Sequence, residues 1–169
     1  MLEITPLRPD DAAVIAQAFT DIGWDKPETQ YVRYLAEQTA GDRPVLVARM
    51  DGVFAGYLTV VWAPQYEPFR AAGVPEIQDF NVLPPYRRQG IGTALMDAAE
   101  ALIATRSKTA GIGVGLYPDY GPAQRLYVLR GYLPDGRGIA WNGMAVTPMQ
   151  EVMVDDDLAL YFTRDLGRS

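Results

Sequence analysis

The sequence Arg-Arg-Gln-Gly-Ile-Gly-Thr at residues 87–93 constrains this chain more than any other stretch. It follows an apolar run at residues 77–83, which two prolines close, and it opens a long amphipathic stretch at residues 91–103. A strand, a glycine-containing turn and a helix in this order gather backbone N–H groups at a helix N-terminus, where they can hold a phosphate. The sequence therefore predicts an anion-binding turn between a strand and a helix.

Two familiar phosphate-binding motifs do not fit this turn. The P-loop requires Gly-Lys-Ser/Thr, but Gly92 is followed by threonine and alanine, with no lysine. The dinucleotide pattern G-x-G-x-x-G requires a glycine at the position of Leu95. What remains is the pattern R-x-x-G-x-G, which Arg87, Gly90 and Gly92 form.

The composition limits the available chemistry. At 169 residues the chain is expected to form one domain, residues 1–169, with a sizeable core. It has no cysteine, which excludes disulfides and thiolate metal sites, and no histidine, the commonest general base and metal ligand. We therefore expect no metal, and any acid–base step must use carboxylate, tyrosine, lysine or water.

The charge balance bears on partners and location. Fifteen basic residues against twenty-one acidic ones leave a net charge of −6. This argues against nucleic acid as a partner and favours a cationic substrate, although acidic residues also serve solubility alone. Residues 1–6 lack the features of an export signal, and no apolar run approaches the roughly 20 residues of a membrane span. The expected location is the cytoplasm, without membrane contact.

Hydrophobic periodicity predicts strands along most of the chain. They are expected over residues 2–7, 45–50, 53–62, 76–83, 111–116 and 158–163, with further strand material from Tyr132 onward. Asp51-Gly52 predicts a hairpin turn. The glycines in residues 111–116 predict a splayed or closely approached backbone.

Helices are expected over residues 11–20, 30–39, 91–103 and from Gly121 to a C-terminal cap at Gly131. Residues 63–75, with three prolines and a glycine, are expected to form a loop. The resulting order, β-α-α-β-β-β-α-β-α-β-β, indicates a three-layer mixed sheet with helices on both faces.

Two segments carry a resemblance to a known family. Residues 76–96, with the R-x-x-G-x-G pattern, resemble the acetyl-CoA-binding core of GNAT-family N-acetyltransferases. Residues 121–132 resemble the family's A-x-x-L-Y-x-x-x-G-F/Y segment through Ala123, Leu126, Tyr127, Gly131 and Tyr132. The predicted elements also follow the family order, so the resemblance covers most of the chain. It implies a GNAT-like α/β fold (α+β mixed sheet) whose sheet is mostly antiparallel, with one splayed pair of parallel strands.

The resemblance also implies how acetyl-CoA is held. The amides from Gln89 to Thr93 would cap the pyrophosphate, the two glycines would let the backbone approach, and the arginines would add positive charge. The pantetheine arm would pair with the main chain of residues 80–83, and the Val82 N–H would bind the acetyl carbonyl. The expected contacts are Phe80, Val82, Leu83, Arg87, Arg88, Gln89, Gly90, Ile91, Gly92, Thr93, Tyr120 and Ala123.

The chain departs from the family at Tyr120, where relatives often have an asparagine seven residues before the catalytic tyrosine. A tyrosine cannot reproduce the amide contact, although its ring could stack on the pantetheine. By the same resemblance Tyr127 would be the general acid that protonates the leaving thiolate. Taken without the resemblance, a tyrosine at this helical spacing is more often core packing.

The general base is expected to be Glu76, at the start of the strand at 76–83, with Asp79 as the alternative. Strand alternation groups Glu76 with Gln78 and Phe80, although a bulge in this strand would swap the later faces. Either carboxylate can also be read as a solvated charge at a strand end.

The acceptor is the least specified part. Trp24, Tyr31 and Tyr34 could form an aromatic surface for a cation, or they could be ordinary core residues. The expected substrate contacts are Trp24, Tyr34, Gln78 and Asp79. The resemblance implies acetyl transfer from acetyl-CoA to a primary amine of a small molecule. The alternatives are acetylation of a protein N-terminus or lysine, and an inactive CoA-binding regulatory domain. Edge strands near the C-terminus would allow a homodimer.

Overall fold

The computed structural model describes residues 1–167, which form two compact units. The first unit contains Met1–Val61 and Gln78–Leu102, and the second contains Trp62–Ile77 and the chain from Ile103 onward. Strand β4 (Glu76–Val82) begins in the second unit and continues into the first, because the boundary falls after Ile77.

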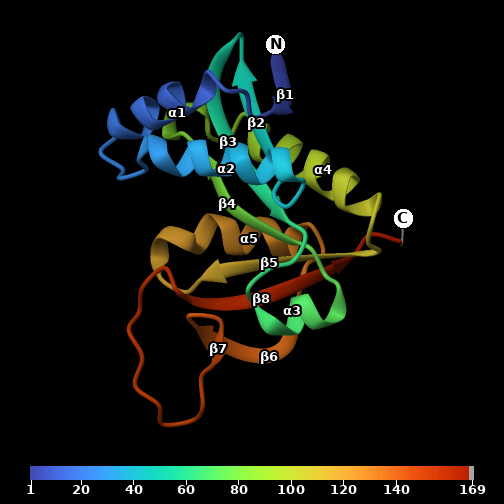
Figure 1. Ribbon diagram of the computed structural model, residues 1–169. Helices are drawn as coiled ribbons and strands as arrows, with labels where there is room; N and C mark the ends of the chain where they lie inside the picture. Colours follow the sequence, from blue (N-terminus) through green and yellow to red (C-terminus); the bar gives the residue numbers. More distant parts are fainter. Residues whose placement is uncertain (168–169) are drawn as a thin grey trace. The chain divides into compact units, whose positions relative to one another are not determined.

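The first unit is a sheet with strand order β1-β2-β3-β4. Its strands besides β4 are β1 (Leu2–Pro6), β2 (Val45–Met50) and β3 (Val53–Val61), and β1-β2 and β2-β3 pair antiparallel. Its helices are α1 (Asp11–Thr20), α2 (Glu28–Ala40) and α4 (Ile91–Ala104), whose last two residues reach the second unit. Helices α1 and α2 lie on one face of the strands and α4 on the other (Figure 1).

The predicted hairpin between β2 and β3 is confirmed. Asp51 and Gly52 both have positive φ, 51° and 82°, as a type I′ turn requires.

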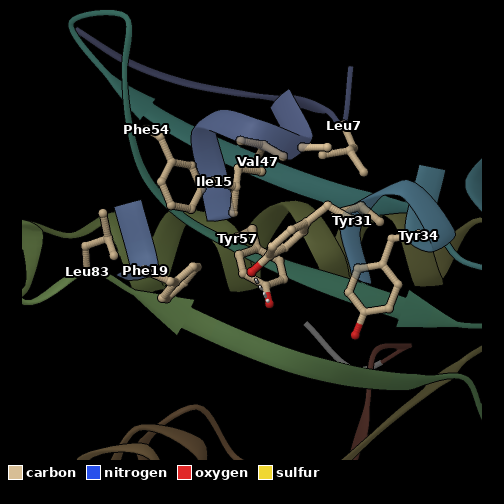
Figure 2. Packing of buried hydrophobic residues seen from close by; sticks show 11 residues of the cluster. Leu7, Ile15, Phe19, Tyr31, Tyr34, Val47, Phe54, Tyr57 and Leu83 are labelled. Atoms are coloured by element: carbon tan, nitrogen blue, oxygen red, sulfur yellow. Dashed lines mark hydrogen bonds between the residues drawn. The ribbon is translucent and has the colours of Figure 1, made fainter. Parts of the chain in front are cut away.

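The buried side chains of α1, α2 and the adjoining strands form an aromatic-rich core. The tyrosine hydroxyls of this core, from Tyr31, Tyr34 and Tyr57, point to the side away from Leu7 and Val47 (Figure 2).

The second unit has the strand order β4-β5-β8-β6-β7. These strands are β5 (Thr109–Gly115), β6 (Leu133–Trp141), β7 (Met144–Ala145) and β8 (Leu158–Asp165). The pair β4-β5 is parallel, with two registered pairs, Glu76–Gly111 and Ile77–Ile112, and the other pairs of the unit are antiparallel. A short parallel ladder in a mostly antiparallel mixed sheet is the architecture that the resemblance implies.

The expected loop at residues 63–75 is wrong in one respect, because it contains helix α3 (Glu67–Ala72). Pro68 lies in the first turn, where its missing N–H costs no hydrogen bond, and Gly73 ends the helix in the left-handed conformation with φ 65°. The proline and glycine that suggested a loop are therefore the start and stop of a short helix. Helix α5 (Gly121–Leu129) follows its prediction, and β7 adds a strand to the predicted order.

The prediction of a closely approached backbone in β5 is confirmed. A Cβ at Gly111 would lie 2.4 Å from the ring of Phe69, and one at Gly113 would lie 2.9 Å from the ring of Tyr161. A Cβ at Gly115 would lie 2.4 Å from the ring of Tyr120. Alternate residues of a strand face the same side, so aromatic rings pack directly against the backbone on one face of β5 at these three glycines.

Candidate functional site

The turn before α4 presents backbone N–H groups that have no recorded acceptor in the part of the chain that the structure describes. Arg88 and Gly90 are left-handed, with φ of 60° and 81°, and reverse the chain after the short 3₁₀ turn at Pro84–Tyr86. The Ala94 N–H donates to the Gly90 carbonyl at 3.0 Å, which is the first bond of the helix. The N–H groups of residues 91–93 precede this bond and point out of the helix N-terminus, where an anion is favoured.

The two glycines of the turn serve different purposes. Gly90 has no atom within 4 Å of a Cβ position, so its requirement is the positive φ. A Cβ at Gly92 would instead lie 3.2 Å from Cζ of Phe80, a tight contact with β4. The residues present therefore fit the pyrophosphate of acetyl-CoA, since within residues 1–167 the N–H groups of residues 91–93 have no recorded backbone acceptor and the space at Gly90 is open.

The side chains of Arg87 and Gln89 in the turn donate hydrogen bonds to nearby backbone carbonyls. Arg87 Nε donates to the Val82 carbonyl at 2.9 Å, and its guanidinium lies 5.8 Å from the ring centre of Trp24. Gln89 Nε2 donates to the Pro85 carbonyl at 3.0 Å. Arg88 is exposed, as is Arg87, so both keep donors at the surface beside the helix N-terminus.

The main-chain groups of Leu83, the residue after β4, are hydrogen-bonded within the first unit. The Leu83 N–H donates to the Ala55 carbonyl at 2.9 Å, and the Leu83 carbonyl accepts from the Tyr86 N–H at 2.9 Å. Leu83 is thus used within the first unit. The Val82 carbonyl also has a partner, Arg87 Nε, so the contacts that the resemblance implies at Phe80, Val82 and Leu83 stay predictions.

A left-handed residue interrupts β4. Asp79 has φ 49°, which an extended strand does not contain and which aspartate tolerates better than most residues. The alternation that groups Glu76 with Gln78 therefore does not extend through Asp79 to Phe80. This is the bulge-type irregularity that the sequence left open.

Asp79 is the centre of a hydrogen-bond network in the first unit. Its carboxylate accepts bonds from side chains of four segments: the loop before α2, α2 itself, β3 and β4. The donors are Lys26 Nζ at 2.7 Å, Gln30 Nε2 at 2.9 Å, Tyr34 Oη at 3.1 Å, Asn81 Nδ2 at 2.9 Å, and Tyr57 Oη. We call these five residues and Asp79 the Asp79 network.

This network sets the protonation of its members. Burial alone would raise the pKa of Asp79, but the ammonium of Lys26 and the bonds from Lys26, Tyr57 and Tyr34 outweigh it and lower the pKa. Burial and the charge of Asp79 raise the pKa of Tyr34 to about 12, and they raise the pKa of Tyr57 further. At neutral pH the carboxylate is ionised and the hydroxyls are protonated donors.

The four expected substrate residues all lie in the first unit. Tyr34 and Asp79 are hydrogen-bonded to each other, whereas Trp24 stacks on Phe19 with ring centres 5.7 Å apart and is 37% exposed. Gln78 Oε1 accepts from Arg43 at 3.3 Å. Tyr31, the third aromatic residue considered, is fully buried and belongs to the core.

The expected base, Glu76, lies in the second unit and is buried. It is in register with Gly111, so it shares the sheet face on which Phe69 and Tyr161 cover β5. Burial, followed by the charge of Glu76, raises the pKa of Tyr161. Glu76 is therefore an interior carboxylate and not a solvated strand-end charge.

The expected acid, Tyr127, lies on α5 and is 4% exposed. Its ring centre is 6.1 Å from that of Tyr132. Within residues 1–167 its hydroxyl has no hydrogen-bond partner, and burial is the cause that raises its pKa. The hydroxyl is therefore protonated at neutral pH and free to donate.

Tyr120, the position where the sequence departs from the family pattern, is hydrogen-bonded and packed within the second unit. The Tyr120 hydroxyl donates to Asp156 Oδ1 at 2.8 Å, and its ring covers Gly115. Tyr117 donates to the same carboxylate, so the two tyrosines anchor the segment between β7 and β8. Next to the half-buried Ala123, Gln124 Nε2 donates to the Gly115 carbonyl at 2.8 Å.

The sequence did not indicate several of these residues. Lys26, Gln30 and Tyr57 converge on Asp79, but they come from separate segments with no shared motif. The one available signal was Asp79 itself, an acidic residue inside an apolar strand. Among residues 1–167 no helix is long and apolar enough to cross a membrane, and no group of three or more histidine, cysteine or carboxylate residues could hold a metal ion.

Comparisons with known proteins agree with this geometry. No curated protein matches the chain. The chain is similar to the N-acetyltransferase from Staphylococcus aureus Mu50 (TM-score 0.71, 15% identity, 98% of this chain and 99% of that one). It is also similar to a protein assigned as an acetyltransferase from Salmonella typhimurium, solved with its cofactor acetyl-CoA (TM-score 0.68, 18% identity, 99% and 95%). A third is the ribosomal-protein-S18-alanine N-acetyltransferase from Escherichia coli (TM-score 0.69, 16% identity, 100% and 96%).

At these identities the solved structures show the fold. The sequence itself matches the model of the Acetyltransferase (GNAT) family over residues 12–132, which is most of the chain and includes residues of both units. The match contains the turn at 88–93, Glu76 and Tyr127. The chain therefore belongs to the GNAT family of acetyltransferases, enzymes that use acetyl-CoA as co-substrate.

Proposed function

We propose that this enzyme transfers the acetyl group of acetyl-CoA to a primary amine of a small molecule by direct attack in a ternary complex. The observation that carries the proposal is the turn before α4, where the N–H groups of residues 91–93 have no backbone acceptor among the described residues and Gly92 stands where a Cβ would press on Phe80. Because one family match includes residues of both units, we also propose that residues 1–169 act as one acetyltransferase domain.

The reaction requires two proton transfers. The neutral amine nitrogen attacks the thioester carbonyl carbon, a C–N bond forms, the C–S bond breaks, and the thiolate takes up a proton. We assign that proton to Tyr127, whose side chain is 4% exposed and whose hydroxyl is protonated and has no hydrogen-bond partner among the described residues. The Val82 N–H is the proposed donor to the acetyl oxygen, where negative charge develops.

The amine must lose a proton before or during attack, and two carboxylates on β4 were candidates for the base. The lowered pKa of Asp79 makes it a weak base, and its oxygens already accept five hydrogen bonds. We therefore assign the base to Glu76, directly or through water. Glu76→Gln should alter the basic-group limb of the pH–rate profile, and an unaltered profile would remove this role.

A second candidate is the acetylation of a protein N-terminus. It is supported by the fold similarity to the ribosomal-protein-S18-alanine N-acetyltransferase, which covers the whole chain. A peptide acceptor would require an open groove, whereas a small amine needs a closed pocket.

One assay separates these functions. Release of the CoA thiol from acetyl-CoA is measured over a panel of small primary amines and of peptides with free N-termini. Turnover with small amines supports the proposal, and turnover with peptides alone favours the second candidate. Calorimetry with acetyl-CoA on the wild type and on Gly92→Val tests the turn, since a branched side chain there should abolish uptake. Equal uptake by both proteins would contradict the proposed site.

A further inference from the structure

The chain has two lysines, and one of them is enclosed in the first unit. Lys108 is exposed in the turn before β5. Lys26, by contrast, places its ammonium 2.7 Å from Asp79 Oδ1 and 3.3 Å from the Tyr57 hydroxyl. The same ammonium lies 5.5 Å from the ring centre of Phe19 and 5.8 Å from that of Tyr57. We call this arrangement the ammonium site.

The ammonium site has the chemistry that recognises a primary alkylammonium ion. A carboxylate supplies a charge-assisted hydrogen bond, and the faces of aromatic rings attract a cation electrostatically. The group held there, a primary ammonium on an alkyl chain, is also the group that a primary amine acceptor carries. A guanidinium is planar and larger than an ammonium, so it would not make the same contacts. Apart from the two lysines, the thirteen basic residues of the chain are arginines.

The site would persist if Lys26 left it. Four donors besides Lys26 hold the Asp79 carboxylate, and they come from α2, β3 and β4. Lys26 itself lies in the connection between α1 and α2, and the side chains of Lys26 and Asp79 are 19% and 18% exposed. The ion pair is thus reachable from solvent, and Lys26 is the partner that lies outside the helices and strands.

We propose that Asp79, Tyr57 and Phe19 form a subsite for the acceptor, held in this structure by the ammonium of Lys26, and that the preferred acceptor is a diamine whose second ammonium displaces Lys26. That the diamine is acetylated rests on the proposed function, whereas binding of an ammonium at the subsite does not.

The spacing along β4 suits a short diamine. Asp79 lies three residues before Val82, the proposed donor to the acetyl oxygen. At about 3.3 Å per residue the two positions are at most about 10 Å apart, and less where the left-handed Asp79 shortens the strand. A diamine on a short alkyl chain can place one nitrogen at Asp79 and the other near the acetyl carbon, whereas a monoamine cannot.

The first experiment uses stability without acetyl-CoA. Lys26→Met removes the ammonium but keeps an apolar side chain, so Asp79 is left short of a cation and the thermal midpoint should fall. Butylammonium or butanediamine should then raise the midpoint of Lys26→Met more than that of the wild type, because binding to the folded state stabilises it. Lys108→Met is the matched control and should respond like the wild type. Adding Asp79→Asn to Lys26→Met should remove the rescue.

The second experiment measures turnover, first by the wild type, where the comparison of acceptors does not depend on whether a variant folds, and then by Lys26→Met. Propane-, butane- and pentanediamine are compared with monoamines of equal length. A lower KM for a diamine, reduced several-fold further by Lys26→Met because a tethered competitor is gone, supports the proposal. Equal KM values for diamines and monoamines, or no rescue of Lys26→Met by any alkylammonium, would overturn it. Rescue with no turnover on any amine would retain the subsite and reject the proposed acetyl transfer.

Discussion

Two buried tyrosines, Tyr57 in the first unit and Tyr127 in the second, look alike in burial and differ in their partners. Tyr57 is fully buried and Tyr127 is 4% exposed. The Tyr57 hydroxyl donates to the ionised Asp79, while the Tyr127 hydroxyl has no partner within residues 1–167. A hydroxyl that is already hydrogen-bonded stabilises the fold, whereas an unpartnered one is available for chemistry. The same substitution at each position should therefore have opposite consequences.

The largest expected effect is a loss of stability on substituting Asp79, the carboxylate to which Tyr57 donates. Asp79→Asn removes a half-buried charge from five donors, including Lys26, and should lower the free energy of unfolding by about 3 kcal/mol. Asp51→Asn is the matched control, because Asp51 is also left-handed but its side chain is 77% exposed, and it should change stability by less than about 0.5 kcal/mol. Urea denaturation measures both. Equal losses would show that the network adds nothing beyond the backbone conformation.

Tyr127→Phe should lower kcat about 100-fold by removing the proposed acid. Acetyl-CoA affinity and the free energy of unfolding should change little, because the substitution removes a hydroxyl that has no described partner. Steady-state kinetics, calorimetry and urea denaturation test the three expectations. An unchanged kcat would end the assignment of Tyr127, and a large loss of stability would reveal a structural role instead.

Tyr57→Phe should show the reverse pattern. It removes a hydrogen bond to a charged carboxylate and should cost about 2 kcal/mol of stability. With a monoamine acceptor kcat should stay close to the wild-type value, since Tyr57 takes no part in the proposed proton transfers. The comparison fails if Tyr57→Phe reduces kcat as much as Tyr127→Phe does.

The smallest expected effects are changes in stability at the extremes of pH. Asp79 and Tyr127 should lose their contributions in opposite directions of pH. The pKa of Asp79 is lowered by folding, so the stability it adds is present above its unfolded pKa of about 3.9 and is lost as the pH falls. The difference between wild type and Asp79→Asn should therefore shrink in acid. The pKa of Tyr127 is raised by folding, so wild type should lose stability relative to Tyr127→Phe above about pH 10. Urea denaturation as a function of pH checks both limbs, and a reversed sign on either would refute its assignment.

Much of the architecture was predictable because it depends on local signals. Apolar periodicity indicated the strands and helices, and Asp51-Gly52 indicated the hairpin that the structure contains. Prolines misled the prediction for residues 63–75, since Pro68 begins a helix as readily as it belongs to a loop. Tyr120 could be recognised as a departure from the family, but its bond to Asp156 joins positions 36 residues apart.

The sequence by itself determined the turn before α4, because φ at Gly90, the glycine at 92 and the free N–H groups at a helix start all follow from neighbouring residues. It also determined that glycines in β5 would admit close neighbours, though not that Phe69, Tyr161 and Tyr120 would supply them. The tertiary structure alone decided the state of Asp79. Its left-handed backbone and its lowered pKa depend on Lys26, Gln30, Tyr34 and Tyr57, which approach it only when separate elements pack together. Hydrogen bonds and charges act through space, so no local pattern could have indicated them.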